Sequence, residues 1–258
     1  MKCDYNAGMP DTYFVNKDNS GSFCKTNGVL FEKGEKPRGL VMEFPGLGGN
    51  SCLGGTQDLG NYIGEPGPYL ASKGILLAYM FTGPWSWMNP GAVRLTDLTV
   101  GAIFEKYGLD RSIRPVAAGG SMGGLGALMW SAGSHYNVKA CAAHCPGVDM
   151  LSTFWHREDF SRTLFDAVGS LDMSIEDGLK SVSPVYNIDR LPDIPYYITC
   201  DGEDECFDRE ETERFAAAMK ASGKNVRYVC FEGAAHGEFS PPEERNRYWD
   251  FIIDNALL

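Results

Sequence analysis

A single serine, Ser121, stands inside a run of glycines, in the order Gly119, Gly120, Ser121, Met122, Gly123. This is the pattern G-x-S-x-G, in which a sharp strand-to-helix turn holds a serine in strained dihedrals with its hydroxyl exposed. The residues two positions away must be small, because strand and helix pass close together. The turn also aims a helix N-terminus at the reacting group, so the Met122 N–H can donate to a developing oxyanion. The pattern predicts a nucleophilic serine, although Gly-rich strand-helix turns also bind phosphates.

A serine nucleophile needs a base, and the base needs an orienting carboxylate. With such a turn, the expected chain order is serine, then an acid after a late strand, then histidine after the last strand. His236 follows the last apolar run of the chain and precedes its terminal helical segment, so it is the predicted base. Burying several anions together would be costly, so only one acid of the preceding loop can orient it. The candidates are Asp201, Glu203, Asp204 and Glu205.

The elements that must position these groups follow from the pattern of apolar residues. Short apolar runs bounded by Gly, Pro or Asp predict strands buried on both faces, at 38–44, 74–81, 114–120, 138–145, 195–202 and 225–233. Helical segments alternate with them, at 67–74, 92–108, 122–136, 208–223 and 242–258. This alternation predicts an α/β fold, with a mostly parallel central sheet and helices on both faces.

One segment interrupts that alternation. Residues 150–184 are rich in aromatic and charged side chains, have a helical pattern and fall between two predicted strands. We expect them to form a small helical cap insertion over one end of the sheet. The 258 residues are otherwise expected to form a single domain.

The order of these motifs resembles the α/β-hydrolase superfamily over most of 38–251. Residues 183–237 are most similar to the catalytic domain of prolyl-oligopeptidase-like serine esterases and peptidases, with S-P, a strand, H-G-x-x-D, a helix, a strand and G-x-x-H-G. The resemblance implies an α/β-hydrolase fold. It also implies an acid shortly after the Gly, and we place it at Asp204, two residues after Gly202. Asp201 stands where the family commonly has His, so it stays the alternative acid.

The same resemblance implies a second oxyanion donor in the loop after the strand 38–44. The family usually reads H-G-G-G there, and this chain has Pro45 in place of the His, followed by Gly46, Leu47, Gly48 and Gly49. We assign the donor to the Leu47 N–H. The alternative is a plain Gly-rich turn.

Four side chains are candidates for a substrate pocket. Trp85 and Trp87 lie in a Pro/Gly-rich loop after a strand, His144 ends another strand, and Trp155 lies in the predicted cap. They predict an aromatic wall for an acyl group or a sugar ring. The alternative for the loop tryptophans is packing under neighbouring helices.

No metal or cofactor is expected. The chain has eight cysteines and no C-x-x-C pair, and the spacing of Cys141, His144 and Cys145 matches no standard zinc pattern. The formal net charge of −11 argues against nucleic acid as a partner. The sequence has neither a signal-peptide pattern nor an apolar run of membrane-spanning length, so we expect no membrane association and a cytoplasmic location, unless a signal peptide has been removed.

These features predict a serine hydrolase that cleaves small carboxylic esters through Ser121, Asp204, His236 and an acyl-enzyme. The expected substrates carry short acyl or hydroxycinnamoyl-type groups, with a carbohydrate as one possible alcohol. Alternatives are a prolyl-oligopeptidase-like peptidase or aminopeptidase and, from a different class, a non-enzymatic binding protein on a hydrolase fold. The oligomeric state does not follow from the sequence.

Overall fold

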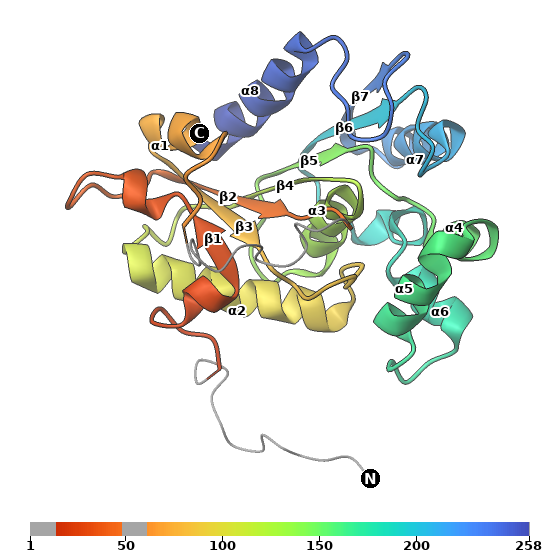
Figure 1. Cartoon of the computed structure of the whole chain (residues 1–258), viewed down its shortest axis with the longest axis horizontal. Helices are drawn as coiled ribbons and strands as arrows, with labels where there is room; N and C mark the ends of the chain where they lie inside the picture. The colour runs from red at the N-terminus through yellow and green to blue at the C-terminus, as the bar shows by residue number, and fades with distance from the viewer. Residues whose placement is uncertain (1–13, 48–60, 258) are drawn as a thin grey trace.

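One seven-stranded sheet organises the chain, and the computed structural model describes residues 14–47 and 61–257 (Figure 1). The strand order is β1-β3-β2-β4-β5-β6-β7, and β1 is antiparallel to β3 while the other neighbours are parallel. The strands are β1 (Cys24–Thr26), β2 (Gly39–Phe44), β3 (Ile75–Met80), β4 (Val116–Gly120), β5 (Ala140–His144), β6 (Pro195–Asp201) and β7 (Asn225–Phe231). The six predicted strands are confirmed, and the short edge strand β1 was not predicted because three residues carry no recognisable period.

Helices cover both faces of this sheet (Figure 1). Helices α1 (Gly67–Ser72) and α8 (Glu243–Leu257) lie on one side, where Leu70 and Ile252 join a buried apolar cluster. Helices α2 (Pro90–Tyr107), α3 (Met122–Gly133) and α7 (Arg209–Ala221) contribute to a larger cluster on the other side. The central strands are buried on both faces, as their apolar runs predict.

Three further helices occupy the segment between β5 and β6: α4 (Met150–His156), α5 (Glu158–Val168) and α6 (Ile175–Ser181). The buried residues of α5 recur at helical spacing and make one apolar face: Phe160, Thr163, Leu164, Ala167 and Val168. Two hydrogen bonds fasten that helix to the loop after β3. The Trp87 indole N–H donates to the Thr163 hydroxyl at 3.1 Å, and the Asn89 amide donates to the Ala167 carbonyl at 2.8 Å.

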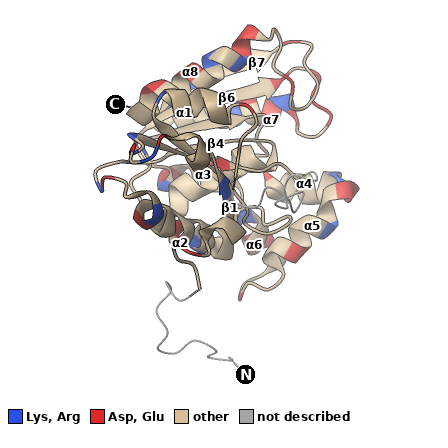
Figure 2. Ribbon diagram, turned by 60° about the vertical axis from the view of Figure 1, so that its left-hand side comes forward, with Lys and Arg blue, Asp and Glu red and all other residues tan. Residues whose placement is uncertain are grey.

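Acidic and basic residues are interspersed along the outer helices α2, α5 and α8 (Figure 2). Ion pairs lie on the helix surfaces, as with Arg162 and Asp166 of α5 or Lys180 and Glu176 of α6, each four residues apart. None of the described helices is long and apolar enough to cross a bilayer.

Candidate active site

The turn from β4 into α3 holds Ser121 in a backbone conformation that side chains rarely adopt, with φ 59° and ψ −127°. A Cβ on Gly119 would lie 2.4 Å from the Gly123 carbonyl oxygen, and a Cβ on Gly123 would lie 2.0 Å from the Phe44 carbonyl oxygen. Only glycine fits at either position, because strand and helix cross this closely. The turn therefore stores strain at the serine and leaves its hydroxyl at the start of the helix.

Three side chains from distant parts of the chain meet at this turn. The His236 Nε2 lies 2.8 Å from the Ser121 Oγ, and the His236 Nδ1 lies 2.8 Å from the Asp204 Oδ2. A carboxylate only accepts hydrogen bonds, so Nδ1 carries the proton and Nε2 accepts from the serine hydroxyl. The Asp204 side chain is 3% exposed and the His236 side chain 14%, so the histidine reaches solvent while its partner does not. This arrangement can deprotonate a serine.

The loop after β6 fixes Asp204 from the other side. Its second oxygen, Oδ1, accepts from the backbone N–H groups of Cys206 at 2.7 Å and Phe207 at 3.0 Å. The Phe207 ring also meets the imidazole of His236 edge-on, with centroids 5.5 Å apart. The carboxylate can therefore turn only slightly without breaking a hydrogen bond.

The alternative acid, Asp201, has a different partner. It is the last residue of β6 and is fully buried, and its Oδ2 accepts from the Gly237 N–H at 2.8 Å. Gly237 directly follows His236, so Asp201 holds the backbone of the histidine loop and Asp204 holds the imidazole.

The loop after β2 approaches the serine where the second oxyanion donor is predicted. A Cβ on Gly46 would lie 3.8 Å from the Ser121 Cβ, and Leu47 is half-buried against the larger core cluster. Gly48 and Gly49 lie outside the described residues. The Met122 N–H belongs to the first turn of α3, where backbone donors have no acceptor within the helix.

The four predicted pocket residues do not form one wall. Trp87 has no exposed surface, because its ring packs edge-on against Phe160 of α5 and its N–H bonds Thr163. Placing it in a substrate pocket was wrong. The local sequence around an aromatic loop residue is the same whether that residue lines a cavity or lies beneath a helix. Trp85 is half-buried, with Arg162 of α5 over its ring at 4.6 Å.

The other two pocket candidates also lie apart. Trp155 is 72% exposed on α4, where its ring meets only Phe154 among the described aromatic pairs. His144 is 5% exposed, so it offers a substrate almost no surface. Its ring stacks on Phe239 at 4.0 Å, and its Nδ1 lies 2.7 Å from the Thr199 hydroxyl. Neither prediction is supported by this packing.

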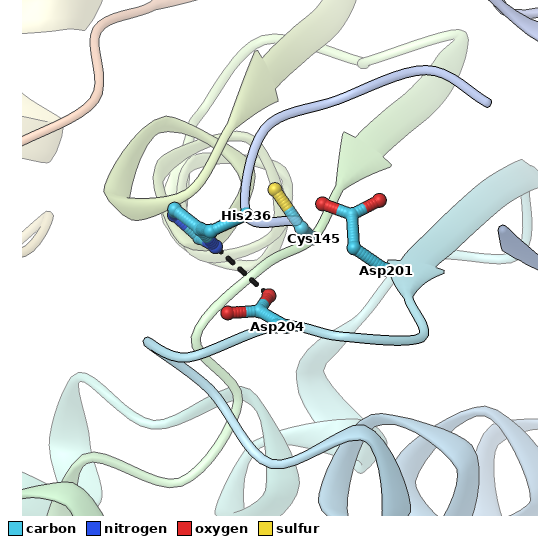
Figure 3. A group of neighbouring side chains, drawn as sticks. All are labelled: Cys145, Asp201, Asp204 and His236. Carbon is cyan, nitrogen blue, oxygen red and sulfur yellow. Dashed lines mark hydrogen bonds and ion pairs between the residues drawn. The ribbon is translucent and has the colours of Figure 1, made fainter. Parts of the chain in front are cut away.

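Four potential metal ligands lie close together here: Cys145, Asp201, Asp204 and His236 (Figure 3). Their ligand atoms lie within 4.8 Å of one another. Burial, together with the nearby Asp201, raises the pKa of the Cys145 thiol well above its usual range, so the sulfur keeps its proton and is a poor ligand. The His236 Nδ1 already donates to Asp204. These groups fit proton handling better than metal binding.

Arg157, between α4 and α5, was not singled out from the sequence. Its guanidinium donates to the carbonyl oxygens of Glu205 and Cys206, the second at 2.7 Å, and pairs with Asp159. It therefore ties the helical segment to the loop that carries Asp204. No local pattern marks such a residue, because its partners lie 48 and 49 positions away.

Several solved structures share this fold. Puromycin hydrolase superposes with a TM-score of 0.67 at 22% identity, over 87% of this chain and 34% of that chain. The Pyrococcus horikoshii acylaminoacyl peptidase gives 0.64 at 20% identity, over 85% and 37%. The propionate-bound esterase Est2 of the planctomycete Thermogutta terrifontis gives 0.53 at 21% identity, over 88% and 86%. The chain thus spans about a third of the length of the first two.

These likenesses confirm the α/β-hydrolase fold predicted from the sequence. None of the curated proteins matches the chain closely enough to count as a relative. A family model does match: that of the prolyl oligopeptidase family fits residues 89–255, well over half of the chain. The chain therefore belongs to the prolyl oligopeptidase family.

Proposed function

We propose that this protein is a serine esterase that hydrolyses small carboxylic esters, with Ser121, His236 and Asp204 as its catalytic triad. The observation that carries the proposal is the hydrogen-bonded chain from the strained serine through the imidazole to the buried carboxylate, with two contacts of 2.8 Å. Such a chain activates a hydroxyl that is otherwise a weak nucleophile.

The reaction follows from the positions of these atoms. As the Ser121 Oγ bonds to the ester carbonyl, its proton passes to the His236 Nε2, and the carbonyl electron pair becomes an oxyanion. The Met122 and Leu47 N–H groups stabilise that oxyanion. The oxyanion then re-forms the carbonyl, the ester C–O bond breaks, and the imidazolium, held by Asp204, protonates the leaving alcohol. Water attacks the acyl-enzyme by the same steps and releases the acid.

We also propose that the acyl group of the substrate is short. A short acyl chain gains about 25 cal/mol per Å² of apolar area that it buries, whereas a long chain would extend beyond the compact site that we expect and gain little more. The similarly folded Est2 esterase is described as bound to propionate and to butyrate, which supports acetyl to butyryl esters. A hydroxycinnamoyl preference has less support, because the predicted aromatic wall loses Trp87 to the core.

A peptidase is the second candidate, favoured by the family and by the acylaminoacyl peptidase among the similar folds. Comparing kcat/KM for p-nitrophenyl acetate and butyrate with that for acylaminoacyl and X-Pro p-nitroanilides separates the two. The esterase proposal expects the esters to be preferred well beyond their greater intrinsic reactivity, measured as hydroxide-catalysed hydrolysis of the same compounds. A preference for an anilide after this correction would establish the peptidase.

A chain-length series from acetyl to dodecanoyl esters tests the acyl preference. We expect kcat/KM to fall beyond butyryl and to show no increase above the critical micelle concentration. Values that keep rising through the long chains would indicate a lipase-like site. Labelling by a fluorophosphonate, lost in Ser121→Ala, tests the triad itself, because only an activated serine reacts. A wild-type protein that is not labelled would favour the non-enzymatic binding protein.

A further inference from the structure

The backbone of the loop that carries His236 is held by carboxylates on both sides of the histidine. The Ala235 N–H donates to the Glu238 Oε2 at 3.1 Å, and the Gly237 N–H donates to the Asp201 Oδ2 at 2.8 Å. Glu238 is exposed, whereas Asp201 has no exposed surface. A hydrogen bond to a buried charged acceptor contributes more than one in water, so Asp201 is the stronger anchor.

The other oxygen of Asp201 is unusual for a purely structural acceptor. Oδ1 is buried and has no hydrogen-bond partner among the described residues. A buried carboxylate that is only half satisfied is costly, and a neutral amide or hydroxyl could accept from Gly237 at lower cost. An aspartate at this position differs from such a neutral acceptor in its negative charge, so we ask what that charge does.

The groups that face this charge can be named from each element. His144 ends β5, and its Nε2 lies 4.0 Å from the Asp201 Oδ2, again without a hydrogen bond among the described residues. The Cys145 thiol, the imidazole of His236 and the Asp204 carboxylate all lie within the 4.8 Å cluster (Figure 3). His236 is the one of these that becomes a cation during acyl transfer.

Burial changes the pKa of two of these groups in opposite directions. It raises the pKa of the Asp201 carboxyl to about 6 and lowers the pKa of His144 to about 4. Near neutral pH Asp201 is therefore ionised and His144 is neutral, so no charge on His144 cancels that of Asp201. The negative charge remains available to an imidazolium beside it.

We propose that Asp201 is a positioning residue of the triad: it fixes the His236 loop through the Gly237 N–H, and its charge supplements that of Asp204 in stabilising the imidazolium. The inference rests on the proposed function, since it assumes that His236 takes the proton of Ser121. Asp201 itself gains and loses no proton in the reaction. The serine proton travels only to the His236 Nε2 and on to the leaving group.

The test compares Asp201→Asn with the wild type in p-nitrophenyl acetate hydrolysis between pH 5 and 9. The amide keeps the size and an acceptor oxygen but removes the charge. We expect kcat to fall about tenfold to a hundredfold with KM nearly unchanged, since misplacement by about 1 Å costs on the order of 10²-fold. The acid limb of the pH profile should move down by about one pH unit, because an opposite charge within ~4–6 Å favours the charged form of its neighbour.

Asp208→Asn is the matched control, because Asp208 is an exposed carboxylate in the same loop that caps α7 through the Glu210 N–H. It should leave both kcat and the acid limb unchanged. Should Asp201→Asn fail to fold by thermal melting, Asp201→Ser offers a smaller neutral acceptor for the same comparison. An Asp201 variant that folds with wild-type kcat and an unmoved acid limb would overturn the inference. Fluorophosphonate labelling of wild type separates this result from failure of the triad, which would abolish labelling altogether.

Discussion

Polar side chains are buried and hydrogen-bonded at the carboxyl edge of the sheet, whereas those on the surface of helices α4 to α6 lie in water. At the sheet edge, Asp204 is almost fully buried, and each of its oxygens accepts a hydrogen bond from the chain. On the helices, pairs such as Arg162 with Asp166 lie in water, where an ion pair contributes about 0 to 1 kcal/mol. Polar substitutions should therefore cost activity at the edge and very little on the helices. What the helices contribute must come from their buried apolar face and from the few groups that reach the edge.

The largest expected effect is at the strained serine. Ser121→Ala should lower kcat by about 10⁶-fold, since removing a triad nucleophile leaves only binding and oxyanion stabilisation. The fold should be retained, because the substitution removes only the Ser121 hydroxyl and no apolar contact of the core. Single-turnover kinetics with p-nitrophenyl acetate, alongside circular dichroism, would measure both. Retention of a tenth of wild-type activity would remove Ser121 from the triad.

Asp204→Asn should rank next, with a loss in kcat of about 10⁴-fold. The amide presents a donor or a weak acceptor to the His236 Nδ1, so the tautomer that accepts the serine proton is no longer favoured. The loss should exceed that of Asp201→Asn, which keeps the imidazole contact intact. Steady-state kcat for both variants gives the ranking. A reversed order would assign the acid to Asp201.

Much of this edge could be predicted because local backbone chemistry dictates it. Gly119 and Gly123 indicate that β4 and α3 cross too closely for a Cβ at either position. Chain order alone places His236 after the last strand. The choice of Asp204 over Asp201 was less local. It came from a resemblance, because Asp201 ends β6 and Asp204 lies in the loop directly after it, and their roles differ only in the group of the His236 loop that each one contacts.

The largest effect expected from the helical segment is on stability. Trp87→Ala should lower the free energy of unfolding by about 3–5 kcal/mol, because it leaves a cavity beneath α5 and removes the hydrogen bond from the indole N–H to the Thr163 hydroxyl. Trp155→Ala, with the same change on an exposed ring, should stay within about 0.5 kcal/mol. Urea unfolding of the pair measures the contrast. Equal effects would show that the two tryptophans do not differ in burial as described.

This contrast could not be predicted, for a physical reason. Trp85 and Trp87 share a loop and a residue type, and a periodic pattern carries no information on whether a helix far along the chain will cover one of them. The hydrogen bond between Trp87 and Thr163 joins positions 76 apart. Pairings at this separation are decided by tertiary packing, so the sequence predicted the helices and left the burial of the tryptophans open.

Arg157 contacts both regions, and its substitution is expected to have the smallest effect on activity. Its guanidinium joins α5, through Asp159 and the Phe160 ring at 4.9 Å, to the carbonyl groups of Glu205 and Cys206. Arg157→Ala frees the loop that carries Asp204, yet both amide hydrogen bonds to that carboxylate remain. We therefore expect kcat to fall about tenfold with KM unchanged, well below the 10²-fold cost of a 1 Å misplacement. Arg157→Lys should restore part of the loss, because lysine keeps the charge and a donor but lacks the planar guanidinium that reaches two carbonyls.

Arg214→Ala, which removes an exposed arginine paired with Glu210 on α7, serves as the control and should leave kcat unchanged. Stopped-flow acylation rates for the three variants measure the effect. Wild-type rates in a folded Arg157→Ala protein would mean that the helical segment lies beside the active site without supporting it.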